Sequence, residues 1–553
     1  MTHPARTCPS LQCRMSFRAQ FLVRVFTLSV AVLLAWPVLT VLSSWLQFTP
    51  ESSSILAEMA RTVLPDYLGT TLWLCALVSV GVISMGTVSA AAVTLFDFRG
   101  RRTLEWALLL PLAMPAYVVA YAYTDFLQFS GPLQTWMRST WHLEGRVIPD
   151  VRSVWGAACV FTLALYPYVY LLARTALAER ANHLMEAARL LGAAMPRRIL
   201  RVALPLARPA IAAGTALALM ETLADFGVSS YFGIQTFTAG IYKAWLVMDS
   251  RTAAAQLATM LLVVVVVLLA LEQRAQSRLR FASTRADRVS AESQPSRLSG
   301  WAAFTAWVLC ALPVLFGFAL PVAFMLRALV LGTAWGDLPW ARFGQWALTS
   351  LSLGLTTAVL AVGIAMLLAS YARLQPSRMS RLVVRLVGLG YAVPGAVVVV
   401  GLLLPVGWLQ ATWPNSGVGF WLTATVLGLV WAYLVRFVAV ALQSVQSGYS
   451  RLSPSLDDSA RMLGVSGLRL VARVHGPLLR KPAAAAALLV LVDVMKELPA
   501  TLVLRPFNTD TLAVMAYQLA RDERLGEAAL PSLALVLVGL LPVILLSRTL
   551  RRH

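Results

Sequence analysis

Long apolar stretches recur along the whole chain and are separated by shorter polar segments. An α-helix needs about 20 apolar residues to cross a bilayer core about 30 Å thick. Twelve stretches meet this length, and two of them, 206–229 and 482–504, are doubtful as spans because they carry Glu221, Asp225, Asp493, Lys496 and Glu497. The other ten are 20–45, 67–95, 103–127, 153–175, 252–272, 301–326, 346–371, 383–408, 418–444 and 529–547. The pattern predicts an all-α integral membrane protein with twelve transmembrane helices.

A polar stretch rich in arginine and serine, residues 274–300, lies between the sixth and seventh apolar stretches. It has no apolar periodicity, which is typical of a connecting segment. We therefore expect a cytoplasmic linker at 274–300. It divides the chain into a first six-span half, residues 1–273, and a second six-span half, residues 301–553.

Composition narrows the class of protein. Of the 553 residues, 59% are apolar and only 13% are charged, yet the formal net charge is +21. An ordinary soluble chain is about 45–50% apolar and about 25% charged, which argues against a soluble enzyme. Five cysteines in this length do not make a disulfide scaffold. A multi-span membrane protein and a basic nucleic-acid-binding protein remain.

The position of the basic residues separates these two classes. When the N-terminus is placed inside, most of the 46 lysines and arginines fall in inner segments. The outer segments carry about as many acidic as basic residues. This distribution follows the positive-inside rule and predicts that both termini are cytoplasmic. Because each short basic run flanks an apolar stretch, we expect a lipid bilayer as partner and no nucleic acid.

Two inner loops repeat one another at an offset of 272 residues. The loops are 177–209 and 449–482, and they align without a gap when Gly192 is placed on Gly464. The same offset places Glu221 on Asp493 and Asp225 on Glu497. The aligned loop pairs are Ala188 with Ala460, Arg189 with Arg461, Leu191 with Leu463, Arg197 with Arg469, Arg201 with Arg473, Val202 with Val474, Pro205 with Pro477 and Arg208 with Arg480. The two halves are thus predicted to be parallel repeats.

Each loop is predicted to form two short helices joined by a turn. Gly192 and Gly464 would end the first helix, because glycine adopts the left-handed conformation at this position without strain. Pro196 fits the first turn of the next helix. In the second copy, Ser455 and Asp458 resemble a capping box.

These loops resemble the hallmark motif of permease subunits of binding-protein-dependent ABC importers of type I. In that motif Glu-Ala-Ala precedes a glycine, and an aliphatic residue and Leu-Pro follow at fixed spacing. The first copy is Glu186, Ala187, Ala188, Gly192, Val202, Leu204 and Pro205. The second copy is Asp458, Ser459, Ala460, Gly464 and Pro477, with Gly476 in place of the leucine. The second copy therefore departs from the family at its acidic triplet.

The resemblance implies that each loop is a coupling helix that docks on a separate ATPase subunit. Two such subunits would bind ATP and Mg, and a periplasmic binding protein would deliver the substrate. The chain contains no G-x-x-x-x-G-K-[ST] phosphate loop. We therefore expect a transport channel subunit of the bacterial inner membrane, with no catalytic residue, no cofactor and no metal site of its own.

Two segments resemble the ferric iron group of these importers. They are 220–245 and 492–520. Fused twelve-span permeases also serve thiamine, phosphonate and sulfate-like systems, so these substrates stay open as alternatives. The resemblance favours ferric iron.

Five ionisable residues fall within the two doubtful spans and are candidates for the translocation pathway. They are Glu221, Asp225, Asp493, Lys496 and Glu497. Charges inside a membrane are costly and by default suggest a functional site. The competing interpretation is structural, with Lys496 neutralising one carboxylate and the other acids capping helix ends. The prolines Pro115, Pro167 and Pro394 are expected to kink their spans.

A secondary transporter of the major facilitator type is the main rival interpretation. The segment 97–102 resembles the Asp-x-x-Gly-Arg-Arg loop of that family. The glycine expected before it is Val93 here, and the second half has no counterpart. A membrane-embedded scaffold or enzyme is disfavoured, since the five histidines are scattered and none is paired at metal-ligand spacing.

Overall fold

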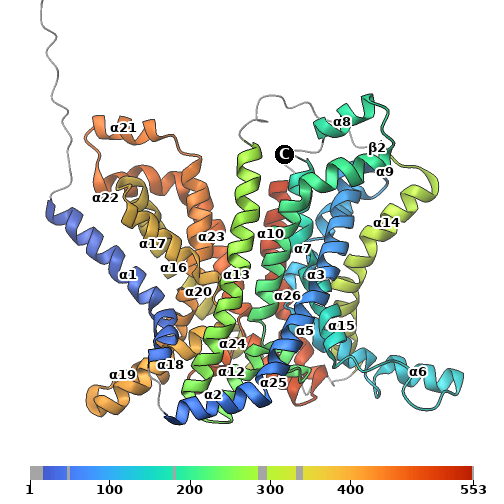
Figure 1. The fold of residues 1–553 in the computed structure, drawn as a ribbon, viewed down its shortest axis with the longest axis horizontal. Helices are drawn as coiled ribbons and strands as arrows, with labels where there is room; N and C mark the ends of the chain where they lie inside the picture. The colour runs from blue at the N-terminus through green and yellow to red at the C-terminus, as the bar shows by residue number, and fades with distance from the viewer. Residues whose placement is uncertain (1–16, 47–49, 179–181, 284–295, 332–339, 551–553) are drawn as a thin grey trace, which may run out of the picture. The chain divides into compact units, whose positions relative to one another are not determined.

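The computed structural model describes residues 17–46, 50–178, 182–283, 296–331 and 340–550, and these ranges are almost entirely helical (Figure 1). The only sheet in these ranges is one parallel pair of two-residue strands, β1 Phe96–Asp97 and β2 Ser296–Arg297. Its register joins Phe96 to Ser296 and Asp97 to Arg297. The all-α class predicted from the apolar pattern is confirmed.

The helices follow one another along the chain with short connections. Up to residue 283 they are α1 Phe17–Ser43, η1 Ser44–Leu46, α2 Pro50–Thr62, α3 Leu64–Leu95, α4 Arg101–Ala107, η2 Leu110–Ala113, α5 Ala116–Leu127, α6 Pro132–Trp141, α7 Val154–Ala176, α8 Asn182–Leu190, α9 Met195–Arg198, η4 Ile199–Ala203, α10 Leu204–Ala224, α11 Gly227–Tyr231, α12 Phe237–Leu246 and α13 Arg251–Ser283. Beyond it they are α14 Gly300–Val314, η5 Leu315–Ala319, α15 Leu320–Leu331, α16 Trp340–Leu374, α17 Arg378–Gly388, η6 Gly390–Ala392, α18 Gly395–Thr412, η7 Pro414–Ser416, α19 Val418–Thr423, α20 Val426–Ser450, α21 Pro454–Met462, α22 Gly467–Leu470, η8 Val471–His475, α23 Gly476–Lys496, α24 Pro499–Leu504, α25 Leu512–Arg521 and α26 Leu525–Leu550.

Within the described ranges, 10 helices are long and apolar enough to cross a membrane, and a bent helix pair makes an eleventh if it is counted as one span. These eleven correspond to eleven of the twelve predicted stretches. The twelfth, 482–504, begins within α23, which has 21 residues. Arg480, Lys481 and Asp493 fall in every 18-residue window of α23, so its composition is more polar than that of the other spans.

The described residues pack into two units, and each unit draws on both halves of the sequence. Unit 1 comprises Met1–Trp36, Gly354–Tyr391 and Tyr433–Asp493. Unit 2 comprises Pro37–Leu353, Ala392–Ala432 and Val494–His553. The packing units therefore cut across the repeat, and the domain boundaries at 1–273 and 301–553 stay a prediction.

The predicted linker begins as a helix rather than as an irregular segment. Helix α13 continues through Ser283, and residues 284–295 lie outside the described ranges. No glycine or proline occurs between 252 and 283, and glutamine, arginine and alanine favour helix. Nothing in the local sequence ends the helix at residue 273. The loss of apolar periodicity there therefore does not mark the end of the helix.

The internal repeat is confirmed by the element boundaries. Four consecutive helices, α8, α9, η4 and α10, each begin and end 272 residues before α21, α22, η8 and α23. Both η4 and η8 are single π-helical turns. The two loops and the spans that follow them are therefore similar in sequence and identical in helix length.

Helix α7 packs between α3 and α10 in unit 2, and a glycine on each neighbour permits close approach. A Cβ atom added to Gly86 of α3 would lie 2.7 Å from the Cβ of Val169 in α7. A Cβ atom added to Gly214 of α10 would lie 2.7 Å from the Cα of Val169. Both distances are shorter than real contacts. Small residues at such crossings let helix backbones approach in a membrane, where van der Waals packing drives association.

We expect Gly86→Ala to destabilise the protein by roughly 1–3 kcal/mol, because the added methyl group is forced against the backbone of α7. The measurement is the thermal unfolding midpoint of the purified chain in detergent. Gly69→Ala, in the same helix, is the matched control, since no atom lies within 4 Å of its added Cβ. Equal midpoints for the two variants would contradict the close-packing account.

Candidate functional site: two exposed loops and two interrupted spans

The two repeated loops form the same turn in three dimensions. Gly192 has φ +78° and Gly464 has φ +77°, as their predicted role at the helix end requires. In both loops the residue after the glycine donates its N–H to the carbonyl five positions back, at 3.0 Å. This pattern satisfies carbonyls that would otherwise lack a donor at the helix end. Figure 1 shows α8 beyond the end of α7.

The start of the second loop helix differs from the predicted capping box. The cap is Ser453, whose hydroxyl accepts the backbone N–H of Ser455 at 3.3 Å, and Pro454 opens the helix. Asp458 therefore does not lie at the third helical position that a capping box requires. Proline suits the first helical position, so the helix begins one residue earlier than Ser455.

The acidic residue of each motif copy points away from the protein. Glu186 and Ala187 are exposed, and Ala188 is half-buried. In the second copy the Asp458 side chain is 71% exposed and pairs with Arg461 at 2.9 Å. The remaining motif positions comprise exposed Ser459, Gly192, Gly464 and Pro477, buried Ala460 and half-buried Pro205.

Two neighbouring apolar side chains are exposed at the tip of each loop. Leu190 and Leu191 are 86% and 87% exposed, and Met462 and Leu463 are 89% and 83% exposed. The 272-residue offset aligns the first pair with the second. The motif spacing in the sequence does not single out this pair. Its signal is an apolar dipeptide directly before each loop glycine.

The first doubtful span is interrupted at Asp225. Helix α10 ends at Ala224, and Asp225 has the extended conformation, φ −71° and ψ 137°. Its Oδ2 accepts backbone N–H groups of Val228 at 2.9 Å and Ser229 at 3.3 Å at the start of α11. Asp225 therefore lies just beyond the helix that carries Glu221, and the predicted span 206–229 is not one continuous helix.

The second doubtful span is interrupted at the equivalent residue, Glu497. Helix α23 ends at Lys496, and the buried Glu497 carboxylate caps α24. Its Oε1 accepts the N–H of Ala500 at 3.1 Å, and its Oε2 accepts the N–H of Thr501 at 3.1 Å and that residue's hydroxyl at 2.8 Å. Lys496 donates from Nζ to the carbonyl of Leu112 at 3.0 Å.

The segments that follow the two interruptions meet within unit 2. A Cβ on Gly227 would lie 3.0 Å from Cδ2 of Leu498. The hydroxyl of Tyr242 donates to the carbonyl of Pro499 at 2.7 Å, and Tyr117 donates to the carbonyl of Lys496 at 3.3 Å. The Tyr117 hydroxyl thus serves the last carbonyl of α23, and the Tyr242 hydroxyl links α12 to the start of α24. Of the two other acids, Glu221 is half-buried on α10 and Asp493 is half-buried on α23.

A second pair of interruptions lies at the prolines singled out in the sequence. Pro115 precedes α5, and the helical segments on either side of it are bent by 91°. Pro394 holds the same position before α18. The expectation of equivalent proline interruptions in the two halves is confirmed, whereas Pro167 lies inside α7, which continues through it.

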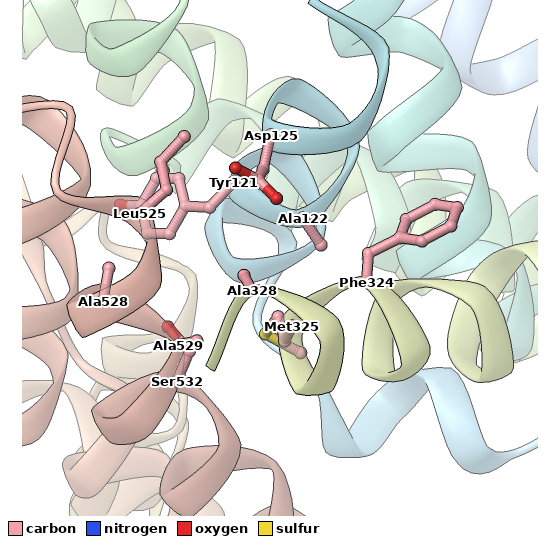
Figure 2. A pocket seen from close by; sticks show the side chains of 10 residues that line it. All are labelled: Tyr121, Ala122, Asp125, Phe324, Met325, Ala328, Leu525, Ala528, Ala529 and Ser532. Atoms are coloured by element: carbon pink, nitrogen blue, oxygen red, sulfur yellow. The ribbon is translucent and has the colours of Figure 1, made fainter. Parts of the chain in front are cut away.

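A small cavity in unit 2 contains an acid that the sequence had not suggested for the pathway. The cavity is partly open to the surface and lies between α5, α15 and α26. Figure 2 shows Tyr121 and Asp125 of α5 on its rim, opposite Met325 of α15 and Ser532 of α26. Asp125 falls near the end of the predicted stretch 103–127. In the described residues no group of three or more His, Cys, Asp or Glu side chains has metal-binding geometry.

Comparison with known proteins adds three relatives and one family. The model of a family described as binding-protein-dependent transport system inner membrane component matches residues 82–281 and again 361–552. A Fe(3+)-transport system permease protein of Haemophilus influenzae is 25% identical over 496 residues, 88% of this chain and 90% of its own. A Bacillus subtilis protein named for molybdenum transport is 26% identical over 31% of this chain and 75% of its own. A Salmonella typhimurium protein named for 2-aminoethylphosphonate transport is 25% identical over 45% of this chain and 90% of its own.

If Asp225 acts as a helix cap, its substitutions should affect stability according to whether a hydrogen-bond acceptor remains. Asp225→Asn keeps an oxygen that accepts the N–H groups of α11, so we expect nearly unchanged stability. Asp225→Ala removes that acceptor, and loss of such a cap costs about 0.5–2 kcal/mol. Thermal unfolding of the two purified variants measures the difference. If asparagine destabilises as much as alanine, the carboxylate is not acting as a cap.

Proposed function

Since the chain belongs to the family of binding-protein-dependent transport system inner membrane components, we propose that it forms the translocation pathway of an importer driven by separate ATPase subunits. The family match covers both halves, and it is a family of non-enzymatic channel subunits of ABC importers. The protein is a multi-pass membrane permease, which also removes the major facilitator interpretation. The observation that carries the partner proposal is the pair of exposed apolar side chains at the same position of both loops.

The loop helices α8 and α21 are the first and second coupling helices of this proposal. Each presents an exposed acid, Glu186 or Asp458, beside apolar side chains that are more than 80% exposed. Contiguous exposed apolar surface rimmed by polar groups marks a protein interaction site. The occupant is an ABC ATPase subunit, one copy for each loop, with ATP and Mg bound by that subunit. The motif residues named in the sequence would line these two contacts.

The fold offers a direct mechanical route from each coupling helix to an interrupted span. Helix α10 begins where the first loop ends and runs for 21 residues to the interruption at Asp225. At 1.5 Å per residue this is about 32 Å of continuous helix. Helix α23 repeats the arrangement up to Glu497. Closure of the ATPase subunits would move the loops, and the helices would carry that movement to the segments where the chain leaves helical geometry.

The substrate proposal is ferric iron. Its support is the iron-transport name of a relative that matches most of the chain, together with the resemblance of 220–245 and 492–520 to that group. Relatives named for molybdenum and 2-aminoethylphosphonate match shorter parts. Asp225 and Glu497 are engaged as caps, so the pathway role rests on Glu221 and Asp493, with Lys496 near the second interruption. A periplasmic binding protein would deliver the substrate, and both termini would lie in the cytoplasm of a bacterial inner-membrane system.

The docking proposal predicts that polar substitution of the loop tips removes the ATPase. Buried apolar anchors at interfaces each contribute about 2 kcal/mol or more, so we expect Leu190→Ser with Leu191→Ser to reduce co-purification of the ATPase subunit at least about tenfold. Met462→Ser with Leu463→Ser tests the second loop. Leu200→Ser is the matched control, because Leu200 is 64% exposed in the same loop but aligns with an alanine in the second half.

Equal loss of the ATPase in the Leu200→Ser control would contradict a docking role for the tips. Glu186→Arg adds a second test, since reversing one exposed charge should leave membrane insertion normal while uncoupling ATP hydrolysis from transport. Undiminished uptake by that variant would remove Glu186 from the coupling contact.

The iron proposal predicts that cells lacking this chain take up radioactive ferric iron at a small fraction of the normal rate when other iron routes are deleted. Re-expression of the chain should restore the rate, and re-expression of the Leu190→Ser, Leu191→Ser variant should not. Normal iron uptake without the chain would reject iron and leave the permease role intact. Uptake of molybdate and 2-aminoethylphosphonate in the same strains would then test the alternatives.

A further inference from the structure

A cluster of polar side chains lies behind the second coupling helix, within unit 1. Asp457, the residue next to the motif acid Asp458, is 6% exposed, whereas Asp458 faces outward. Arg373 at the end of α16 and His475 at the end of η8 both contact the Asp457 carboxylate. Figure 1 shows α21 and α22 at the same end of this unit as α17.

Arg373 joins the second coupling helix to two spans through a single side chain. Its Nε donates to Oδ2 of Asp457 at 2.8 Å, and its Nη2 donates to Oδ1 at 3.3 Å. The same guanidinium donates to the carbonyls of Tyr449 at 3.1 Å and of Leu452 and Ser453 at 3.2 Å. Bidentate pairing of this kind fixes geometry as well as charge. The end of α16, the end of α20 and the start of α21 are therefore held by one group.

His475 extends the cluster toward the membrane spans. Its Nε2 lies 3.0 Å from Oδ1 of Asp457 and its Nδ1 lies 3.1 Å from the hydroxyl of Tyr449, which is 2.7 Å from the hydroxyl of Ser370. With the proton on Nε2, every member of this chain has a donor matched to an acceptor. Burial raises the pKa of Asp457, but the hydrogen bonds from Arg373 and His475 lower it by more, so the pKa lies below its usual value.

The first half has apolar side chains at the loop positions of this cluster. The 272-residue offset aligns Asp457 with Met185, Tyr449 with Leu177 and His475 with Ala203, all three buried. Helices α3 and α16 end at Leu95 and Leu374. Counting back from these ends places Thr94 opposite Arg373 and Ala91 opposite Ser370.

That alignment of α3 with α16 is supported by a repeated hydrogen bond. Thr71 Oγ1 accepts the N–H of Phe237 at the start of α12, and Ser350 Oγ accepts the N–H of Leu512 at the start of α25. The residue separation between Thr71 and Leu95 equals that between Ser350 and Leu374. The first coupling helix is thus backed by apolar packing at positions where the second is backed by a charged network.

The first half does contain a partly buried ion pair at this end, but it does not reach the coupling helix. Arg174 near the end of α7 pairs with Glu105 of α4, and the hydroxyl of Tyr170 donates to the Glu105 carbonyl at 2.7 Å. This pair ties a span to the short helix that follows α3. In the second half the ion pair has the coupling helix itself as one partner.

We propose that Asp457 is a positioning residue of the transport cycle, which locks the second coupling helix to the end of α16 so that the two move together, while the described residues of the first coupling helix show no ion pair of this kind. This rests on the proposed coupling function. It assigns the two acids of the second copy different tasks, because Asp458 faces the partner and Asp457 faces inward. A neutral side chain at 457 leaves Arg373 without its carboxylate and should free the coupling helix from the spans.

The first test measures the lock in the full chain alone. A nitroxide is attached at Met462→Cys, the last residue of α21, in a background without the native cysteines. We expect Asp457→Asn to increase the nitroxide mobility clearly, and Asp457→Glu to restore it toward the wild-type spectrum. Asp458→Asn is the matched control, since it removes the same charge from an exposed pair, which contributes little. An unchanged spectrum for Asp457→Asn would overturn the proposal.

A graft variant covers the case in which the single substitution prevents folding. It carries Ser370→Ala, Arg373→Thr, Tyr449→Leu, Asp457→Met and His475→Ala, the residues found at the first-half positions. Because all the buried charges leave together, no uncompensated charge remains. We expect the nitroxide in this variant to be as mobile as one at Leu190→Cys of the first coupling helix. Wild-type immobility in the graft would also overturn the proposal.

The second test measures coupling in proteoliposomes that contain the full chain, its ATPase subunits and its binding protein, with ferric citrate as the probe. We expect Asp457→Asn to hydrolyse at least about fivefold more ATP for each iron moved, and Asp457→Glu to stay within about twofold of wild type. Both values are normalised to assembled complex, so loss of protein alone does not change the ratio. An unchanged ratio in Asp457→Asn would count against the lock. If no ATPase subunit co-purifies with the wild-type chain, the proposed function is rejected. The nitroxide measurement, which uses the chain alone, would still show whether Asp457 holds the second coupling helix.

Discussion

Every backbone N–H and C=O group at membrane depth needs a hydrogen-bond partner from the protein, because lipid offers none. A continuous helix meets this requirement by itself, and most of this chain does so. Helices α10 and α23 end at Ala224 and Lys496, and the irregular segments that follow them need partners from other parts of the protein. Asp225 and Glu497 supply acceptors for the N–H groups of α11 and α24, and Tyr117 supplies a donor to the last carbonyl of α23. The acids that look expensive by composition are therefore what permits irregular backbone at these two points.

The helices that lead to the two interruptions are continuous from the loops to the residues before the capping acids. The repeat keeps that length identical in both halves, from the loop glycine to the capping acid. What differs is the contact behind each loop. Apolar packing is non-directional, so one helix can shift across another with little change in contact, whereas a bidentate guanidinium–carboxylate pair is lost when its geometry changes. Two loops that lead into helices of equal length can thus respond differently when they are displaced by the same amount.

The parts of the fold that depend on local sequence could be predicted. Apolar length located eleven spans, and Gly192 and Gly464 located the loop turns, since each signal acts within a few residues. The interruption at Asp225 could not be located, because an acid within an apolar stretch is compatible with a pathway residue and with a cap. The alignment singled out Asp458 in the second loop, yet the helical period places its neighbour Asp457 on the inner face with Ala460, three residues on. Only the position of Arg373, far away in the sequence, shows which of the two acids is held inside.

The short strands β1 and β2 have a meaning beyond their size. Residues 296–297 close the segment that connects the halves, and they pair with residues 96–97 of the first half. A linker that only joined the two halves would need no fixed register with either half. Here residues 296–297 pair in a fixed register with residues 96–97, so the end of the connecting segment has a defined position on the first half. Two separately expressed halves would lack this pairing unless the cut preserved residues 296–297 within reach of the loop they recognise.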